Sequence, residues 1–206
     1  QYFQRSTDLN GGVSPESAFA ETSIEIPEEV SLVLEWRAPS KILKPKVINR
    51  RVKVKMLLTP DQQGKVYSEA VLGLIESAQS SLFFQIPYIG MPSAPGLTRG
   101  YIDRLIVALT KKLKTLDDAR VILRTGGSAL SAPAHAAWYF KSKGVDIDNR
   151  LRAIENHHTK GMIVDGRRVL LGSHNWSKPG VSLNRDASLL FDDADVAQYY
   201  TEAFEI

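Results

Sequence analysis

The sequence of 206 residues contains no cysteine. This absence excludes disulfide bonds, zinc sites built on thiolates and cysteine nucleophiles. It leaves the compartment open, because a reducing cytosol and a periplasm both tolerate such a chain. No apolar run approaches the roughly twenty residues that a membrane-spanning helix needs, so we expect a soluble chain. The chain begins with Gln1 rather than with Met, which favours a fragment or a processed product.

A Walker phosphate-binding loop is absent as well. Gly126 and Gly127 follow a predicted strand, but no G-K-[ST] sequence comes after them. With 43% hydrophobic residues, the chain is long enough for one well-packed domain of ordinary size and an extension.

The composition changes near residue 50. Residues 1–51 begin with a polar, acidic stretch, which indicates an N-terminal extension or an interlobe linker, although residues 31–36 could add a strand. A basic run without acidic residues follows. It is either a solvated linker that enters an edge strand, or a patch for nucleic acid or an anionic membrane surface. Its members are Lys41, Lys44, Lys46, Arg50, Arg51, Lys53 and Lys55.

From residue 52 to residue 206 the chain alternates strand and helix patterns, which predicts one domain. This alternation indicates an α/β fold, in which helices flank both faces of a mixed β-sheet. The expected strands cover residues 52–58, 81–89, 119–125, 162–164, 169–171 and 187–191, and the expected helices cover 67–80, 100–114, 133–143 and 193–204.

Chemically versatile side chains concentrate in one run, HHTKGMIVDGRRVLLGSHNW, which covers residues 157–176. Asp165 and Gly166 separate two apolar stretches and predict a hairpin. We therefore expect His158 and Asn175 on neighbouring strands. Alternation in an extended chain puts His158 and Lys160 on one side, and likewise Ser173 and Asn175. Thr159 and His174 then point away.

Written as H-x-K-x4-D-x6-G-S-x-N, this run resembles the HKD signature of the phospholipase D superfamily, with every position filled. The resemblance implies a phospholipase D-like lobe in which His158 attacks phosphorus and forms a phosphohistidine. Lys160 and Asn175 would donate hydrogen bonds to the non-bridging oxygens. No metal and no other cofactor is then required. Ser173 is counted with this site, whereas Asp165 and Gly172 are interpreted as structural residues of the motif.

The resemblance also implies an acidic residue past Asn175 that holds the nucleophilic histidine. In LNRDASLLF this residue is Asp186, where many relatives carry Glu. Its carboxylate would fix the tautomer of His158 and stabilise the imidazolium.

One HKD motif supplies only half of the machinery that the resemblance implies, because a second histidine must protonate the leaving oxygen. No other H-x-K-x4-D motif begins at any of the remaining histidines, which are His135, His157 and His174. The second motif would therefore come from a homodimer partner or from an upstream lobe of a longer protein.

Three more residues are candidates for substrate contact. FFQIPYIG resembles the Q-x-P-Y strand end of lipid-processing relatives, so Gln85 and Tyr88 could line the pocket, although a buried strand end is the alternative. Trp176 could contact a lipid glycerol or a nucleobase, or only the core.

The sequence thus predicts a phosphodiesterase of the phospholipase D superfamily. Its phosphodiester substrate is a phospholipid, hydrolysed or transferred to an alcohol, since the Q-x-P-Y element and the basic surface suit a lipid head group. The alternatives are a metal-independent nuclease of the same superfamily and a noncatalytic phosphate-binding lobe.

Overall fold

The strands form one mixed sheet in the computed structural model, which describes residues 34–35, 43–91, 100–125 and 131–205. Within these residues the sheet has eight strands in the order β1-β5-β4-β3-β6-β7-β8-β2. The strands are β1 (Leu34–Glu35), β2 (Lys53–Leu58), β3 (Ser81–Gln85), β4 (Asp118–Thr125), β5 (Leu151–Glu155), β6 (Gly161–Val164), β7 (Arg168–Gly172) and β8 (Ala187–Asp192). The helices are the 3-10 turn Asp61–Gly64, α2 (Lys65–Glu76), α3 (Tyr101–Thr115), α4 (Ser131–Ser142), α5 (Ile147–Arg150), α6 (Lys178–Ser182) and α7 (Ala194–Phe204).

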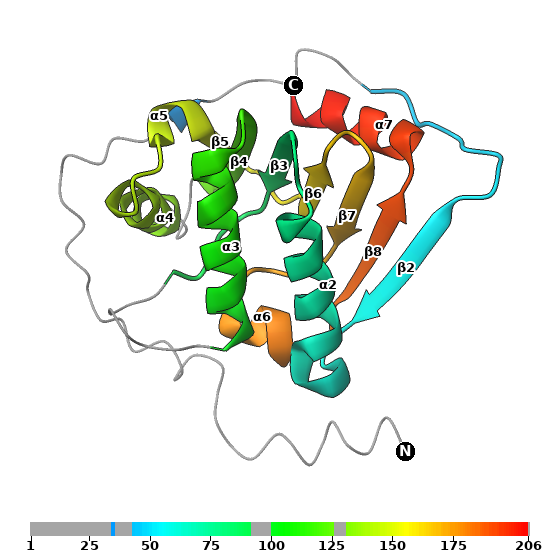
Figure 1. The fold of residues 1–206 in the computed structure, drawn as a ribbon, viewed down its shortest axis with the longest axis horizontal. Helices are drawn as coiled ribbons and strands as arrows, with labels where there is room; N and C mark the ends of the chain where they lie inside the picture. The colour runs from blue at the N-terminus through cyan, green and yellow to red at the C-terminus, as the bar shows by residue number, and fades with distance from the viewer. Residues whose placement is uncertain (1–33, 36–42, 92–99, 126–130, 206) are drawn as a thin grey trace.

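The sheet has a parallel half and an antiparallel half. Strands β1, β5, β4 and β3 pair in parallel, whereas β3, β6, β7, β8 and β2 pair antiparallel. Parallel neighbours need crossover connections, and α3 provides the one between β3 and β4. The antiparallel neighbours β6 and β7 need only a turn (Figure 1).

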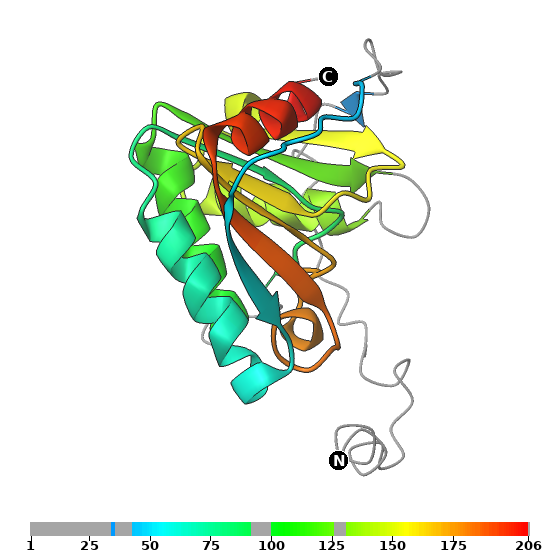
Figure 2. The same ribbon diagram turned by 90° about the vertical axis from the view of Figure 1, so that its right-hand side faces the viewer.

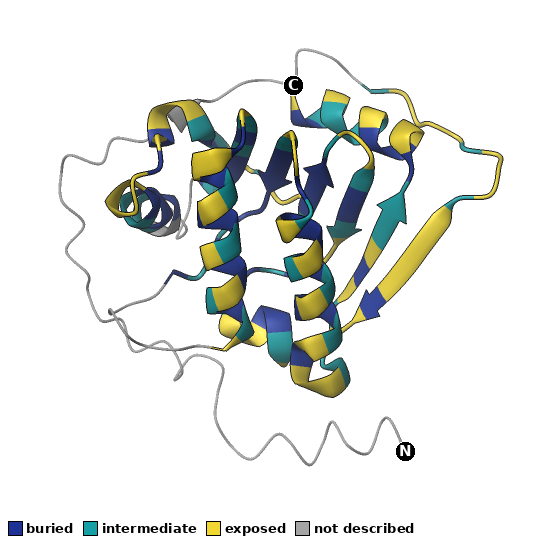
Figure 3. Ribbon diagram, viewed as in Figure 1, coloured by how far each residue is buried: buried dark blue, intermediate teal, exposed yellow. Residues whose placement is uncertain are grey.

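Helices cover both faces of the sheet, as the sequence predicts. Helices α2 and α3 lie side by side on one face (Figures 1 and 2), where their apolar stripes contribute Leu74 and Leu105 to the larger core. Helix α7 packs on the other face through Phe204, which stacks on Phe83 at 5.0 Å. Buried residues follow the sheet and the inner sides of α2 and α3 (Figure 3). Every helix in the described ranges is too short or too polar to cross a membrane.

Two expected elements end earlier in the structure than the sequence suggests. Helix α2 stops at Glu76 rather than at Ser80, because Gln79 and Ser80 donate their N–H groups to Asp165. Strand β3 stops at Gln85 rather than at residue 89, since Pro87 has no N–H to continue a ladder. Pairing still continues irregularly, because Ile86 N–H donates to Ile122 O at 2.9 Å.

Strand β5 and helix α6 were not predicted. Strand β5 alternates buried Leu151 and Ala153 with the half-buried Arg152, a pattern too short and too charged to stand out. The expected strand in residues 31–36 is confirmed, since Leu34–Glu35 pair in parallel with Ala153–Ile154. Most of the expected extension lies outside the described residues, so the boundary at residue 52 stays a prediction.

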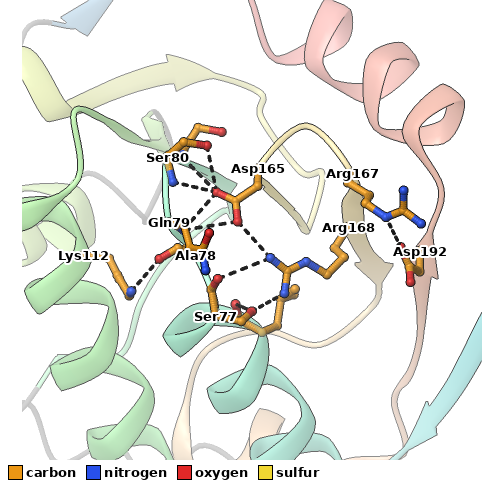
Figure 4. A network of polar contacts seen from close by, with 11 residues as sticks. Ser77, Ala78, Gln79, Ser80, Lys112, Asp165, Arg167, Arg168 and Asp192 are labelled. Atoms are coloured by element: carbon orange, nitrogen blue, oxygen red, sulfur yellow. Dashed lines mark hydrogen bonds and ion pairs between the residues drawn. The ribbon is translucent and has the colours of Figure 1, made fainter.

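The predicted hairpin is present, and Asp165 holds its turn. Asp165 and Gly166 have positive φ values of 52° and 58° between β6 and β7. The Asp165 carboxylate accepts N–H bonds from Gln79, Ser80 and Ser81 at 2.8–3.2 Å and pairs with Arg168 at 2.9 Å (Figure 4). Burial alone would raise the pKa of Asp165, but these hydrogen bonds outweigh it and lower the pKa. The contacts support the structural interpretation of this residue.

Replacing Asp165 with Asn should lower the free energy of unfolding by about 2 kcal/mol at neutral pH, because several bonds to an ionised acceptor weaken together. Urea unfolding measures this change. Asp192→Asn is the matched control, since its pair with Arg167 is more exposed, at 35% and 63%. If Asp165→Asn lowers the free energy of unfolding no more than Asp192→Asn does, the structural role of Asp165 is refuted.

Candidate active site

The HKD residues other than Asp165 lie at one end of the strands, here called the site edge. Register places the carboxyl end of β3 beside the start of β6, because Gln85 pairs with Gly161. The end of β7 lies beside the start of β8, where Gly172 pairs with Ser188. The carboxyl ends of β4 and β5 lie at the same edge, which is where ligands bind in open α/β sheets.

The segment Asn156–Lys160 crosses the site edge. It leaves β5 and enters β6, and the strand order puts β4 and β3 between them. Residues 157–160 are irregular, and Asn175 follows β7 in irregular chain too, so the expectation of His158 and Asn175 on neighbouring strands is wrong. Strand β6 begins only at Gly161 and strand β7 ends at Gly172, so His158 and Asn175 both lie just outside the ladder.

His158 and Lys160 nevertheless lie together. Lys160 Nζ is 3.3 Å from His158 Nδ1 and donates to the His158 backbone carbonyl at 3.0 Å. Lys160 Nζ is also 3.5 Å from His158 Nε2, so the ammonium group lies beside both ring nitrogens. The imidazole of His158 is exposed, and a cation is held next to it.

Ser173 and Asp186 form the second part of the cluster. Ser173 Oγ donates to Asp186 Oδ1 at 2.6 Å and accepts from Ala187 N–H at 3.1 Å. Within the described residues, the Asp186 carboxylate makes no hydrogen bond to His158. The bond that the resemblance implies is therefore not formed in this structure, where Ser173 holds the carboxylate.

Gly172 is required by the close approach of β8. A Cβ atom at this position would lie 2.0 Å from Ser188 Oγ and 2.4 Å from Ala187 O. Any side chain would push β7 away from β8 and separate Ser173 from Asp186. The structural interpretation of Gly172 fits this contact.

His174 is buried beneath the site and holds it through hydrogen bonds to Thr59 and Ser188, a role that the sequence did not indicate. Its ring is 2% exposed and stacks on Tyr67 at 3.8 Å. Thr59 Oγ1 donates its one proton to Asn184 O, so His174 Nε2, 3.2 Å away, must be the donor to Thr59. His174 Nδ1 then accepts from Ser188 Oγ at 2.8 Å. Thr59 Oγ1 also accepts from Asp186 N–H at 3.2 Å, which ties the buried ring to the acid of the site.

Two cations set the electrostatics of the site edge. Burial lowers the pKa of Lys160, the Asp186 carboxylate opposes this, and the charge of Arg124 lowers it further. Burial also lowers the pKa of His157 to about 4, with added effects from the charges of Lys160, His158 and Arg124. Arg124 is therefore close to this cluster, although it belongs to no motif in the sequence.

Unpartnered polar atoms gather at the same edge. In the described part of the chain, Asn175 Oδ1, His157 Nε2 and Arg124 Nε are buried without a hydrogen-bond partner. Such groups are costly, and a ligand that binds them removes the cost. No group of three or more His, Cys, Asp or Glu side chains in the described ranges is arranged to hold a metal ion.

The three expected substrate contacts differ in position. Trp176 is 1% exposed and packs on Phe84 at 4.4 Å, so the structure places its side chain in the core, which corrects its expected role at the substrate. Gln85 is 7% exposed at the end of β3, where it faces Gly161. Tyr88 is half-buried just beyond it.

The basic run is partly neutralised. Arg50 makes ion pairs with Asp193 and Asp195, and Lys46 donates to the Asp195 carbonyl at 3.1 Å. These bonds fasten the segment to the start of α7. Lys41 lies outside the described residues.

Comparison with known proteins agrees with this geometry. Residues 71–206 match the family described as cardiolipin synthase, PLD-like domain. The chain belongs to the phospholipase D superfamily. Nuc, a family member from Salmonella typhimurium, has the same fold, with a TM-score of 0.56, 22% identity, and coverage of 75% of this chain and 93% of that chain. NucT from Helicobacter pylori gives a TM-score of 0.51 at 15% identity, covering 75% and 94%.

Two curated relatives within the superfamily are similar in sequence. The mitochondrial cardiolipin hydrolase of Xenopus laevis is 32% identical over 88 residues, which are 43% of this chain and 41% of that protein. The protein of the same name from Xenopus tropicalis is 31% identical over 86 residues, or 42% and 40%. The aligned part thus spans about two fifths of the length of each relative.

Stability should fall as pH drops from about 6.5, the usual histidine pKa in an unfolded chain, toward about 4. His157 and His174 both have pKa values of about 4 in the folded protein, and burial is the main cause. The unfolded chain then binds more protons, so acid favours unfolding. Urea unfolding at several pH values above about 5, where carboxylates contribute little, measures this slope. His157→Asn should reduce this slope. Histidine signals assigned to His157 and His174 that titrate near 6.5 in the folded protein would contradict the prediction.

Proposed function

We propose that this chain is a phosphodiesterase that works through a covalent phosphohistidine, as part of a site with two HKD motifs. The observation that carries the proposal is the contact between Lys160 Nζ and Nδ1 of His158 at 3.3 Å. It joins a nucleophile to a cation that can hold the phosphate which the nucleophile attacks.

The first step forms a bond between a ring nitrogen of His158 and phosphorus, and it breaks the bond from phosphorus to the leaving oxygen. A histidine of the second motif gives its proton to that oxygen. Lys160 and the amide of Asn175 donate to the non-bridging oxygens, where negative charge accumulates.

The second step reverses the proton transfer. The second histidine takes a proton from water, or from an alcohol, as its oxygen attacks the phosphohistidine. The bond between phosphorus and nitrogen then breaks, and His158 is regenerated. Asp186, through Ser173, fixes the geometry of this side of the site and adds a negative charge that favours the protonated state of Lys160.

A phospholipid is the substrate that we favour. The two Xenopus relatives are named cardiolipin hydrolases, and the match with the PLD-like domain of cardiolipin synthase points the same way. Gln85, which is buried at the site edge, and Tyr88, which is half-buried just beyond it, are the residues that we expect to contact the head group.

His158→Ala should abolish turnover of a phospholipid and Lys160→Ala should lower kcat by about two to three decades, since losing a donor to a transition-state oxygen costs about 3–4 kcal/mol. Thr159→Ala is the matched control, because its side chain lies between them and is exposed. Release of head group from phospholipid vesicles measures activity, and a parallel assay on single-stranded DNA tests the nuclease alternative. Near wild-type turnover by His158→Ala would rule out His158 as the nucleophile.

Activity should also depend on pairing, because one motif lacks the leaving-group acid. We propose that a second copy of the chain covers the exposed apolar residues on one face of β2 and β8, where Met56 (77% exposed) pairs with Leu189 (40%). The same face carries Val54 and Leu58, and Leu58 precedes Thr59, whose N–H donates to Asp186 O at 3.0 Å. A partner on this face therefore lies next to the site, as a C2 dimer with a shared site requires.

Met56→Glu should convert the dimer to an inert monomer, since a charge cannot be buried in an apolar interface without a partner. Light scattering and head-group release measure the two effects. Lys55→Glu is the matched control, as it changes the charge at the next position, whose side chain points to the other face of the strand. A monomer with full activity would disprove the shared site.

A further inference from the structure

Arg124 lies at the site edge without a role in the mechanism above. It is the residue before the last of β4, and its N–H donates to Pro87 O at 3.0 Å, which fixes its backbone beside the end of β3. The side chain is half-buried, and its Nε atom is buried without a partner among the described residues.

Arg120 shows what a structural arginine on this strand does. It lies four residues earlier, on the same face of the sheet, and donates to both oxygens of Asp118 at 2.7 Å. Its guanidinium also lies 4.5 Å from the centre of the Phe83 ring. The contacts of Arg120 account for its place in the fold, whereas those of Arg124 within the described residues do not.

The crossing segment brings two groups of the site, His157 and Lys160, toward Arg124. On its way from β5 to β6 the segment passes the end of β4 first, which places His157 near Arg124 and Lys160 farther along, at the start of β6. The charge of Arg124 acts on both groups. His157 Nε2 is a second buried polar atom there without a partner in the described ranges.

Arg124 is displaced from the centre of the chemistry. Strand β3 separates β4 from β6, so the two backbones are about 10 Å apart at the usual strand spacing. His158 and Lys160 serve the phosphate that is attacked on the side of β6. A guanidinium on the side of β4 has the geometry to bind a different anion, and its planar fork suits phosphate.

We propose that Arg124 binds a second phosphate group of the substrate, next to the phosphate that His158 would attack. The inference rests on the proposed function and narrows its substrate to diesters that carry a neighbouring phosphate. A phospholipid with two phosphodiester groups and a nucleic acid strand share this chemistry. Arg124 is a specificity residue in this proposal, because it touches a part of the substrate that does not react.

The binding test needs no turnover. Calorimetry on the full chain compares inorganic pyrophosphate, which carries two linked phosphates, with inorganic phosphate. Arg124→Met should weaken pyrophosphate binding by about tenfold or more, because a charged hydrogen bond is lost, and should leave phosphate binding within about twofold. Arg124→Lys should restore part of the loss, and Arg120→Met is the matched control that should change neither. An unchanged pyrophosphate affinity in Arg124→Met overturns the proposal.

Kinetics on three substrates tests specificity and source. Arg124→Met should raise KM by about ten- to hundredfold on a substrate with two phosphates and leave kcat/KM for bis(p-nitrophenyl) phosphate within about twofold. The two-phosphate substrates are a 5′-phosphorylated dinucleotide and a phospholipid with two phosphodiesters in detergent, and the one that responds identifies the source. Equal loss on all three substrates would make Arg124 a ligand of the attacked phosphate and overturn the proposal. If the wild type cleaves none of them, the proposed function fails, while the binding comparison still decides the role of Arg124.

Discussion

The crossing of Asn156–Lys160 over the ends of β4 and β3 decides where the histidine and lysine side chains of the candidate site lie. A chain that leaves β5 for β6 must pass two strand ends, and it carries His157, His158 and Lys160 across them in that order. Pairing between strands begins again at Lys160, whose carbonyl accepts a hydrogen bond from Gly172 N–H at 3.3 Å. The proposed nucleophile, His158, therefore belongs to a segment that is held at both ends and makes no strand pairing in between.

The net charge at the site edge is limited in two ways: an acidic group lies near Lys160, and burial keeps His157 neutral. Lys160 and Arg124 are both cationic, and Asp186 is the acidic group whose charge acts on Lys160. His157 avoids adding a third buried cation because its pKa falls to about 4. A doubly charged group that binds as proposed would not have to displace a protein carboxylate from these cations, since Asp186 is bonded to Ser173.

Much of the fold follows from patterns in the sequence, and the exceptions have physical causes. Asp165-Gly166 fixes the hairpin because few residue pairs accept two positive φ values, and the apolar periodicity of α3 fixes the face that it buries. Strand β5 could not be predicted because its extended conformation depends on pairing with β1 and β4 rather than on its own short apolar pattern. The resemblance to the family signature was enough to select the residues of the HKD cluster. Their contacts, and the positions of Arg124 and His174, depend on strand order, which no local pattern encodes.

The two halves of the sheet have different consequences for how the site is assembled during folding. Strands β6, β7 and β8 are neighbours in the chain as well as in space, so Lys160, Ser173 and Asp186 approach one another through short loop closures. Arg124 and His157 belong to the parallel half, whose pairings require long crossovers and form more slowly. The part of the site that would hold the reacting phosphate therefore forms early in folding, through local contacts. The part that contains Arg124 and His157 forms only when the parallel strands pair.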